Sequence, residues 1–217
     1  MSCADELPPV DMNVVSATSI LSGEHRVILQ VLDVLEQVVL VTLRDRRIPT
    51  EHASKILEVL RQFADQCHHA KEENVLFPML EAISPGFGPI RVMMGEHVEG
   101  RAAIHAMAVA VATRDAPGFA TAAGSYVDLL RNHISKEDNI LFRFADQMLS
   151  PDQHEAILES YRRLEHDDIG DGTHERLLGI ADTLAGVYGI PRASDDPQTM
   201  HLLTAICGCA AKKGHHA

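Results

Sequence analysis

One segment of this sequence occurs twice. Residues 68–77 read HHAKEENVLF and residues 133–142 read HISKEDNILF, so six of the ten positions are identical. The tripeptide Gly-Glu-His also occurs twice, at residues 23–25 and 95–97. The order along the chain is therefore Gly-Glu-His, H-x-x-x-E, Gly-Glu-His, H-x-x-x-E. An internal repeat of this kind predicts two copies of one supersecondary unit that pack together.

The repeated segments lie in stretches that are typical of long amphipathic helices. Pro, Gly and capping residues mark the ends of these stretches. A composition rich in small and aliphatic residues, with only 4% aromatics, suits helices better than sheets. Helices are expected over about 18–44, 50–80, 90–113 and 119–149. Because the connections are short, residues 18–149 are predicted to form an up-down-up-down four-helix bundle in an all-α fold.

The chain continues beyond this bundle as a C-terminal helical extension. Ser150, Pro151 and Asp152 form a helix start, with a cap, a first-turn proline and an acid. We expect two additional helices within residues 150–190, and a mobile tail over residues 191–217. Within these segments the expected helices cover about 151–166, 173–187 and 197–206.

Charge and composition exclude several classes of partner. The formal net charge is −12, whereas nucleic acids and anionic membrane surfaces need basic footprints. No apolar run approaches the roughly 18 residues of a membrane span, and the first residues lack the pattern of a secretory signal. The four cysteines form no plausible disulfide framework, which favours a reducing, cytoplasmic setting. We expect a monomer or a homodimer.

Each repeated histidine is expected to face the core. On a helix, residues i and i+4 share one face, so His68 pairs with Glu72 and His133 with Glu137. Aliphatic residues continue that face in both directions, which predicts that it is buried. Burying an unpaired carboxylate costs several kcal/mol, and buried imidazoles also need partners. A bound metal ion would compensate for both.

The repeat also chooses between neighbouring candidates in the second helix. Aligned on the shared Lys and Asn, His68 matches His133, whereas His69 matches Ile134 and Glu73 matches Asp138. We therefore set His69 and Glu73 aside. The predicted metal ligands are His25, His68, Glu72, His97, His133 and Glu137. Glu24 and Glu96 directly precede two of these histidines, about 100° round the helix, and are expected to be solvated.

The predicted ligand set narrows the metal. Four imidazoles and two carboxylates without a thiolate suit iron, manganese or zinc. Six ligands are too many for one tetrahedral zinc ion, and two glutamates can bridge a pair of ions. We therefore expect two iron ions, with manganese or zinc as the weaker alternatives.

These motifs resemble the hemerythrin-like, or HHE cation-binding, family over about residues 18–148. The resemblance rests on EHR around His25, HHAKEENVLFP from His68, GEHVEGR around His97 and HISKEDNILF from His133. It implies a four-helix bundle with a non-haem di-iron centre, bridged by carboxylates and an oxo or hydroxo group.

Oxygen-carrying members of the family have a second histidine one turn after the third-helix ligand, where this chain has Arg101. They also have Asp in place of Glu137. The expected site thus has six protein ligands instead of seven, and is similar to the bacterial branch linked to nitric oxide and peroxide stress and to repair of iron centres.

Three functions fit this prediction. The di-iron centre would bind or sense a diatomic gas, turn over peroxide or nitric oxide as an enzyme, or store and donate iron. In the last case, Cys207 and Cys209 with the terminal histidines would form a transfer arm. Arg101 is expected either to pair with a carboxylate near the site or to extend to the surface. Tyr126 is expected either to donate a hydrogen bond at the metal or simply to pack.

Overall fold

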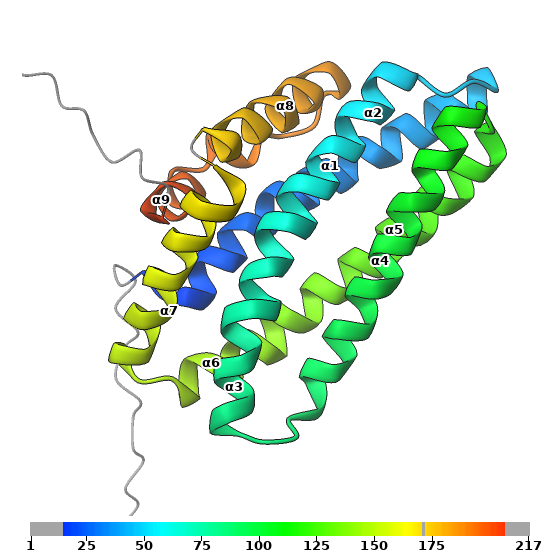
Figure 1. The fold of residues 1–217 in the computed structure, drawn as a ribbon. Coiled ribbons are helices and arrows are strands. Elements are labelled where there is room, and N and C mark those ends of the chain that lie inside the picture. The colour runs from blue at the N-terminus through cyan, green and yellow to red at the C-terminus, as the bar shows by residue number, and fades with distance from the viewer. Residues whose placement is uncertain (1–14, 171, 207–217) are drawn as a thin grey trace, which may run out of the picture.

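The computed structural model describes residues 15–170 and 172–206, and within this part of the chain it contains helices and no strand. Four long helical rods form the bundle (Figure 1). The first is α1, Ala17–Asp45. The second is continuous through α2, Thr50–Val59, η1, Leu60–His69, η2, Glu72–Leu76, and α3, Phe77–Ile83. The third is α4, Gly88–Thr113, and the fourth joins α5, Ala116–Lys136, η3, Glu137–Leu141, and α6, Phe142–Met148.

The rod ends follow from local sequence. Ser16 caps α1 through a reciprocal pair of hydrogen bonds with Ser19, which satisfies backbone N–H groups that have no partner inside the helix. The chain leaves α1 at Arg46 and α4 at Arg114 in the left-handed conformation, with φ of 51° and 59°. The prediction of an all-α bundle is confirmed, and each rod begins and ends within a few residues of its expected limits.

The segments that carry the repeat are wound more loosely than an α-helix. The segments η1, η2 and η3 are π-helical, so their backbone bonds run from residue i+5 to residue i, as from the N–H of Ala70 to the carbonyl of Asp65. Single π-helical turns inside α-helices are frequent at functional sites. A wider turn separates successive side chains by a smaller angle, so neighbouring residues can face the same space.

The bundle core has two apolar clusters. One includes Leu32, Leu35, Leu60 and Phe119, and the other includes Ile20, Leu76, Leu80 and Phe142. The repeated histidines and glutamates fall between these clusters along each rod, and all are buried. A polar layer therefore crosses the bundle between two apolar ends.

The C-terminal extension lies on one side of the bundle, away from α4 and α5 (Figure 1). It consists of α7, Pro151–Leu164, η4, Glu165–Ile169, α8, Thr173–Tyr188, η5, Ala193–Asp195, and α9, Pro197–Ile206. Helices α7, α8 and α9 all contact α1, and η4 and α8 contact η1. No helix in the described part of the chain is long and apolar enough to cross a membrane.

Helix α9 packs onto the bundle, and Leu203 and Ile206 are buried in it. The segment predicted as a mobile tail from residue 191 onward therefore includes a packed helix. Cys207, Cys209 and the terminal histidines, which were predicted to form a transfer arm, lie outside the described residues.

The two Gly-Glu-His glycines make a matched test of this packing. A Cβ atom added at Gly23 would lie 2.9 Å from Cβ of Leu202 in α9, whereas one added at Gly95 would meet nothing within 4 Å. We expect Gly95→Ala to stabilise the protein by up to about 1 kcal/mol, because Ala favours a helix over Gly. Gly23→Ala is expected to lose this gain because α9 must shift. Urea denaturation of both variants measures the difference, and equal stabilisation would contradict the packing of α9 on α1.

Candidate metal centre

All six predicted ligands come together in the polar layer. Each of them is at most 1% exposed. Together with His69 they form two groups that share Glu72, and the donor atoms of each group lie within 4.8 Å of one another. The first group is His25, His68, Glu72 and Glu137, and the second is His69, Glu72, His97 and His133. The structure thus places two clusters of nitrogen and oxygen donors side by side, and their role as ligands stays a prediction.

The two glutamates connect the clusters. Oε1 of Glu72 lies 3.6 Å from Nε2 of His68, and its Oε2 lies 3.4 Å from Nε2 of His97. Oε2 of Glu137 lies 3.3 Å from Nε2 of His25 and 3.2 Å from Nε2 of His133. Each carboxylate therefore reaches one histidine from each hairpin, which is the arrangement expected of bridging ligands.

A carboxylate holds the outer nitrogen of each of the four repeated histidines. The distances from Nδ1 to the carboxylate oxygen are 2.9 Å for His25 with Asp138, 2.9 Å for His68 with Glu24, 2.7 Å for His97 with Glu73, and 2.9 Å for His133 with Glu96. Such contacts fix the ring orientation and the tautomer of metal-binding histidines. The expectation that Glu24 is solvated is wrong, since it is fully buried against His68, whereas Glu96 contacts His133 and remains 17% exposed.

This outer layer determines where each ring has its lone pair. An ionised carboxylate only accepts hydrogen bonds, so each Nδ1 must carry hydrogen, and a neutral ring then has its lone pair on Nε2. Yet the Nε2 atoms of His25 and His68 face each other at 3.0 Å, and those of His97 and His133 at 3.1 Å. Two lone pairs at this distance repel unless a cation lies between or beside them.

The pKa values show that the first pair attracts positive charge. Burial lowers the pKa of His25, but the hydrogen bond to Asp138 and the nearby charges of Glu137 and Asp138 outweigh it and raise that pKa to about 9. Burial, together with the charge of His25, lowers the pKa of His68 to about 4. Without metal the pair thus holds one proton, where a metal ion would supply a larger charge.

The glutamates also lack partners of their own. Neither oxygen of Glu72 nor of Glu137 has a hydrogen-bond partner among the described residues. Burial and the charge of Glu137 raise the pKa of Glu72 well above its usual range. Buried carboxylate oxygens without donors are costly, and cations compensate for them directly. The donor set therefore fits a pair of metal ions.

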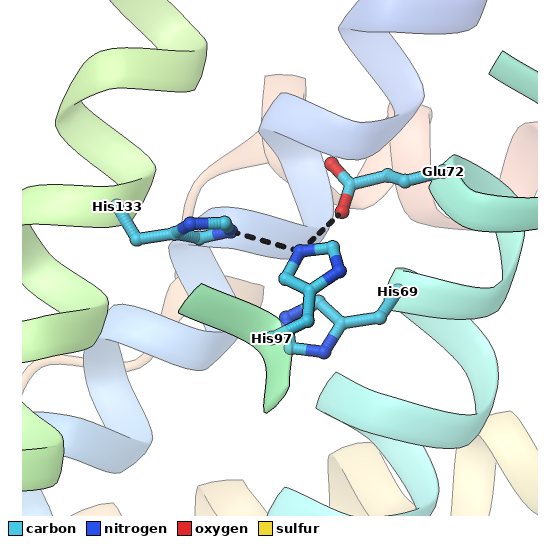
Figure 2. Close-up of side chains that lie close together, drawn as sticks. All are labelled: His69, Glu72, His97 and His133. Carbon is cyan, nitrogen blue, oxygen red and sulfur yellow. Dashed lines mark hydrogen bonds and ion pairs between the residues drawn. The ribbon is translucent and has the colours of Figure 1, made fainter. Parts of the chain in front are cut away.

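His69, which the repeat alignment set aside, lies in the second donor group. Its side chain is buried, and neither ring nitrogen has a hydrogen-bond partner among the described residues. The ring stacks on that of His97 with centroids 3.8 Å apart, and a nitrogen of His69 lies within the second donor group (Figure 2). The candidate set therefore has seven donors, five histidines and two glutamates.

Arg101 takes no ligand position. Its guanidinium donates to Asp65 at 2.7 Å and to Glu73 at 2.6 Å, and Glu73 in turn accepts from His97. Of the two interpretations made from the sequence, the structure shows the pairing with a carboxylate near the site. Tyr126 is buried, faces Gly100, and its hydroxyl forms no hydrogen bond to a described residue.

Comparisons with known proteins agree with this geometry. Residues 16–145 match the hemerythrin HHE cation binding domain. The chain belongs to the hemerythrin HHE cation-binding family. Three uncharacterized proteins are similar to this hemerythrin-like chain at 24% identity: Rv1995 and MT2051 of Mycobacterium tuberculosis and Mb2018 of Mycobacterium bovis. The 185 aligned residues cover 81% of this chain and 72% of each relative. No solved structure matches the chain significantly.

Proposed function

We propose that this protein holds a non-haem di-iron centre that binds or reacts with a small oxidant, namely oxygen, nitric oxide or hydrogen peroxide. The observation that carries the proposal is that the Nε2 atoms face each other at 3.0 and 3.1 Å, beside carboxylates that have no hydrogen-bond partner among the described residues. Imidazole and carboxylate without a thiolate suit iron. When bound, a pair of iron ions supplies redox chemistry and open coordination positions. We place this activity in a cytoplasmic response to oxidative or nitrosative stress.

The two subsites differ in how many histidines they offer. The subsite of His97 and His133 also has His69, whereas that of His25 and His68 has two rings among the described residues. Both share the bridging glutamates. The ion beside His25 and His68 would therefore have fewer protein ligands. We propose that the oxidant approaches this ion.

The seventh donor changes the balance among the candidate functions. The case against an oxygen carrier depended on a six-ligand site, because Arg101 stands where carriers have a histidine. His69 supplies a fifth ring from the neighbouring helix instead. An oxygen carrier or sensor therefore remains a candidate beside a reactive centre. Iron storage, donation or repair of iron centres depends on the terminal cysteines and histidines, which lie outside the described residues.

Metal analysis followed by mixing with oxidants tests the proposal. We expect purified, iron-loaded protein to contain about two irons per chain, and the anaerobically reduced protein to change its visible absorption on mixing with oxygen, nitric oxide or hydrogen peroxide. A stable, reversible change indicates binding or sensing. Oxygen gas released from peroxide indicates a catalase-like activity.

Two results would reject or redirect the proposal. Fewer than one metal ion per chain, unaffected by His68→Ala or His133→Ala, would reject the metal centre. A full complement of iron that ignores all three oxidants but passes to an acceptor protein would favour iron storage or donation.

A further inference from the structure

A lysine lies fully buried next to the metal centre. The side chain of Lys71 is 0% exposed and forms ion pairs with Glu24, which is also 0% exposed, and with Glu165 at 2.6 Å. Its Nζ also lies 3.4 Å from Sγ of Cys67 and 5.9 Å from the ring centre of Tyr161. A buried ammonium group needs such compensation, because leaving it unpaired would cost several kcal/mol. Each partner of Lys71 is therefore expected to contribute to stability or to function.

Two of these partners come from outside the bundle. Tyr161 lies in α7 and Glu165 begins η4, so both belong to the C-terminal extension. Glu165 also receives a contact at 3.3 Å from Nδ1 of His174 in α8. The extension thus closes over Lys71 with one aromatic ring and one carboxylate.

The buried lysine connects the extension to a predicted metal ligand. Lys71 pairs with one oxygen of Glu24, and the other oxygen of Glu24 accepts the Nδ1 hydrogen of His68 at 2.9 Å. Both oxygens of this fully buried carboxylate are therefore in contact with a partner, one on each side. The contacts form an unbroken series from Glu165 through Lys71 and Glu24 to His68.

The repeat provides an internal comparison for this series. Lys136 and Glu96 occupy the equivalent positions in the second hairpin, and Glu96 holds His133 as Glu24 holds His68. Lys136 is 36% exposed and Glu96 is 17% exposed. One copy of the same lysine–glutamate–histidine series is thus sealed from water, and the other is open to it.

The sealed cluster is not a further metal site. Glu24, Cys67, Glu165 and His174 offer donor atoms within 4.8 Å of one another. The ammonium group of Lys71, however, contacts three of these four side chains and already supplies the positive charge between them. The Lys71 ammonium group thus provides the positive charge that a metal ion would otherwise provide in this cluster.

We propose that Glu165 and Lys71 are positioning residues that act through Glu24 on His68, and that the extension thereby makes the two metal subsites unequal. This inference rests on the metal pair of the proposed function. In low dielectric, the Lys71–Glu24 pair fixes the direction and charge of the carboxylate that holds His68 more firmly than its hydrated copy holds His133. The extension is then a structural part of one subsite rather than a separate appendage.

Glu165→Gln in the iron-loaded full-length chain tests this, with Glu175→Gln as the control. Glu175 is an exposed glutamate of the same extension, so both variants remove one charge. We expect Glu165→Gln to release one of the two irons to a chelator about tenfold faster, the lower limit for outer partners of metal ligands. One of the two iron signals in a Mössbauer spectrum is expected to change, and the other to stay.

A second matched pair keeps the test valid if Glu165→Gln folds poorly. Lys71→Met is expected to change release of one iron, whereas Lys136→Met, at the equivalent position, is expected to change it far less. Circular dichroism checks the fold of each variant.

Three outcomes would overturn the inference. If Glu165→Gln and Lys71→Met both showed wild-type release rates and spectra, this inference would fail while the proposed function would stand. The same holds if both irons were released faster to an equal extent. A wild-type chain without a metal pair would overturn the proposed function as well, so the two failures are distinguishable.

Discussion

A Glu72→Leu protein is expected to lose the metal pair and yet to be more stable than the wild-type protein when both are metal-free. Both oxygens of Glu72 are buried without a hydrogen-bond partner among the described residues, and the charge of Glu137 lies nearby. A buried polar group without a hydrogen-bond partner costs about 1–3 kcal/mol, and an apolar side chain of similar volume removes that cost. Metal content should fall to at most about one ion per chain, because a bridging oxygen donor is lost. Elemental analysis and urea denaturation of the chelator-treated proteins measure the two effects.

Glu99→Leu serves as the control for this experiment, since Glu99 is exposed on α4. It should keep the full metal content and leave the free energy of unfolding within about 0.5 kcal/mol of wild type. If the metal-free Glu72→Leu protein is less stable than wild type, protein groups rather than a metal satisfy this carboxylate, and the argument from unpaired oxygens is wrong.

Replacing His69 with Ala is expected to weaken the binding of one metal ion more than about 100-fold. Changes to groups that only support metal ligands already cost about 10–100-fold in affinity, and a direct donor should cost more. Stacking on His97 at 3.8 Å gives His69 a fixed place beside the second donor group. Titration of the metal-free protein with iron(II) under anaerobic conditions measures the two affinities separately.

Ile134→Ala is the matched control, because Ile134 occupies the position of His69 in the second copy of the repeat and is also buried. Both substitutions leave a cavity, which lowers stability. Only His69→Ala should lower the metal affinity. If the two variants bound iron with equal affinity, His69 would not be a ligand, and the candidate donors would be the six predicted by the repeat.

The repeat was sufficient to predict the architecture and six members of the donor cluster. Pro, Gly and capping residues such as Ser150 and Pro151 determine helix ends locally, so the expected limits lie close to the observed ones. The four histidines lie on core-facing positions because apolar residues surround them on the same helix face. Such signals are local or periodic, and a single sequence contains them in full.

His69 could not be placed in this way. Alignment of the repeats matches it to Ile134, and α-helical geometry separates it from His68 by about 100°. The segment Leu60–His69 is instead π-helical, and both neighbouring rings reach the centre. The doublet of histidines, with Asp65 one turn earlier, was the available signal, but no pattern in the sequence reports the wider turn.

The burial of Lys71 also could not be predicted. Its neighbours in sequence resemble those of Lys136, which is partly exposed. The difference arises from Glu165 and Tyr161, which are about 90 residues away in the chain. The recurrence of Glu24 and Glu96 directly before a ligand could have indicated their role on His68 and His133.

The four carboxylates that contact the Nδ1 atoms pair both within and between the two hairpins, and this pattern has a consequence for symmetry. Glu24 and Glu96 each hold a histidine of their own hairpin, whereas Glu73 and Asp138 each hold one of the opposite hairpin. Two identical hairpins related by a twofold axis would satisfy every one of these contacts, but in such a dimer each substitution would appear in both donor groups. Joining the hairpins in one polypeptide removes that constraint. A third ring in one donor group and a sealed lysine beside the other are differences that a single chain with two independently variable halves can acquire.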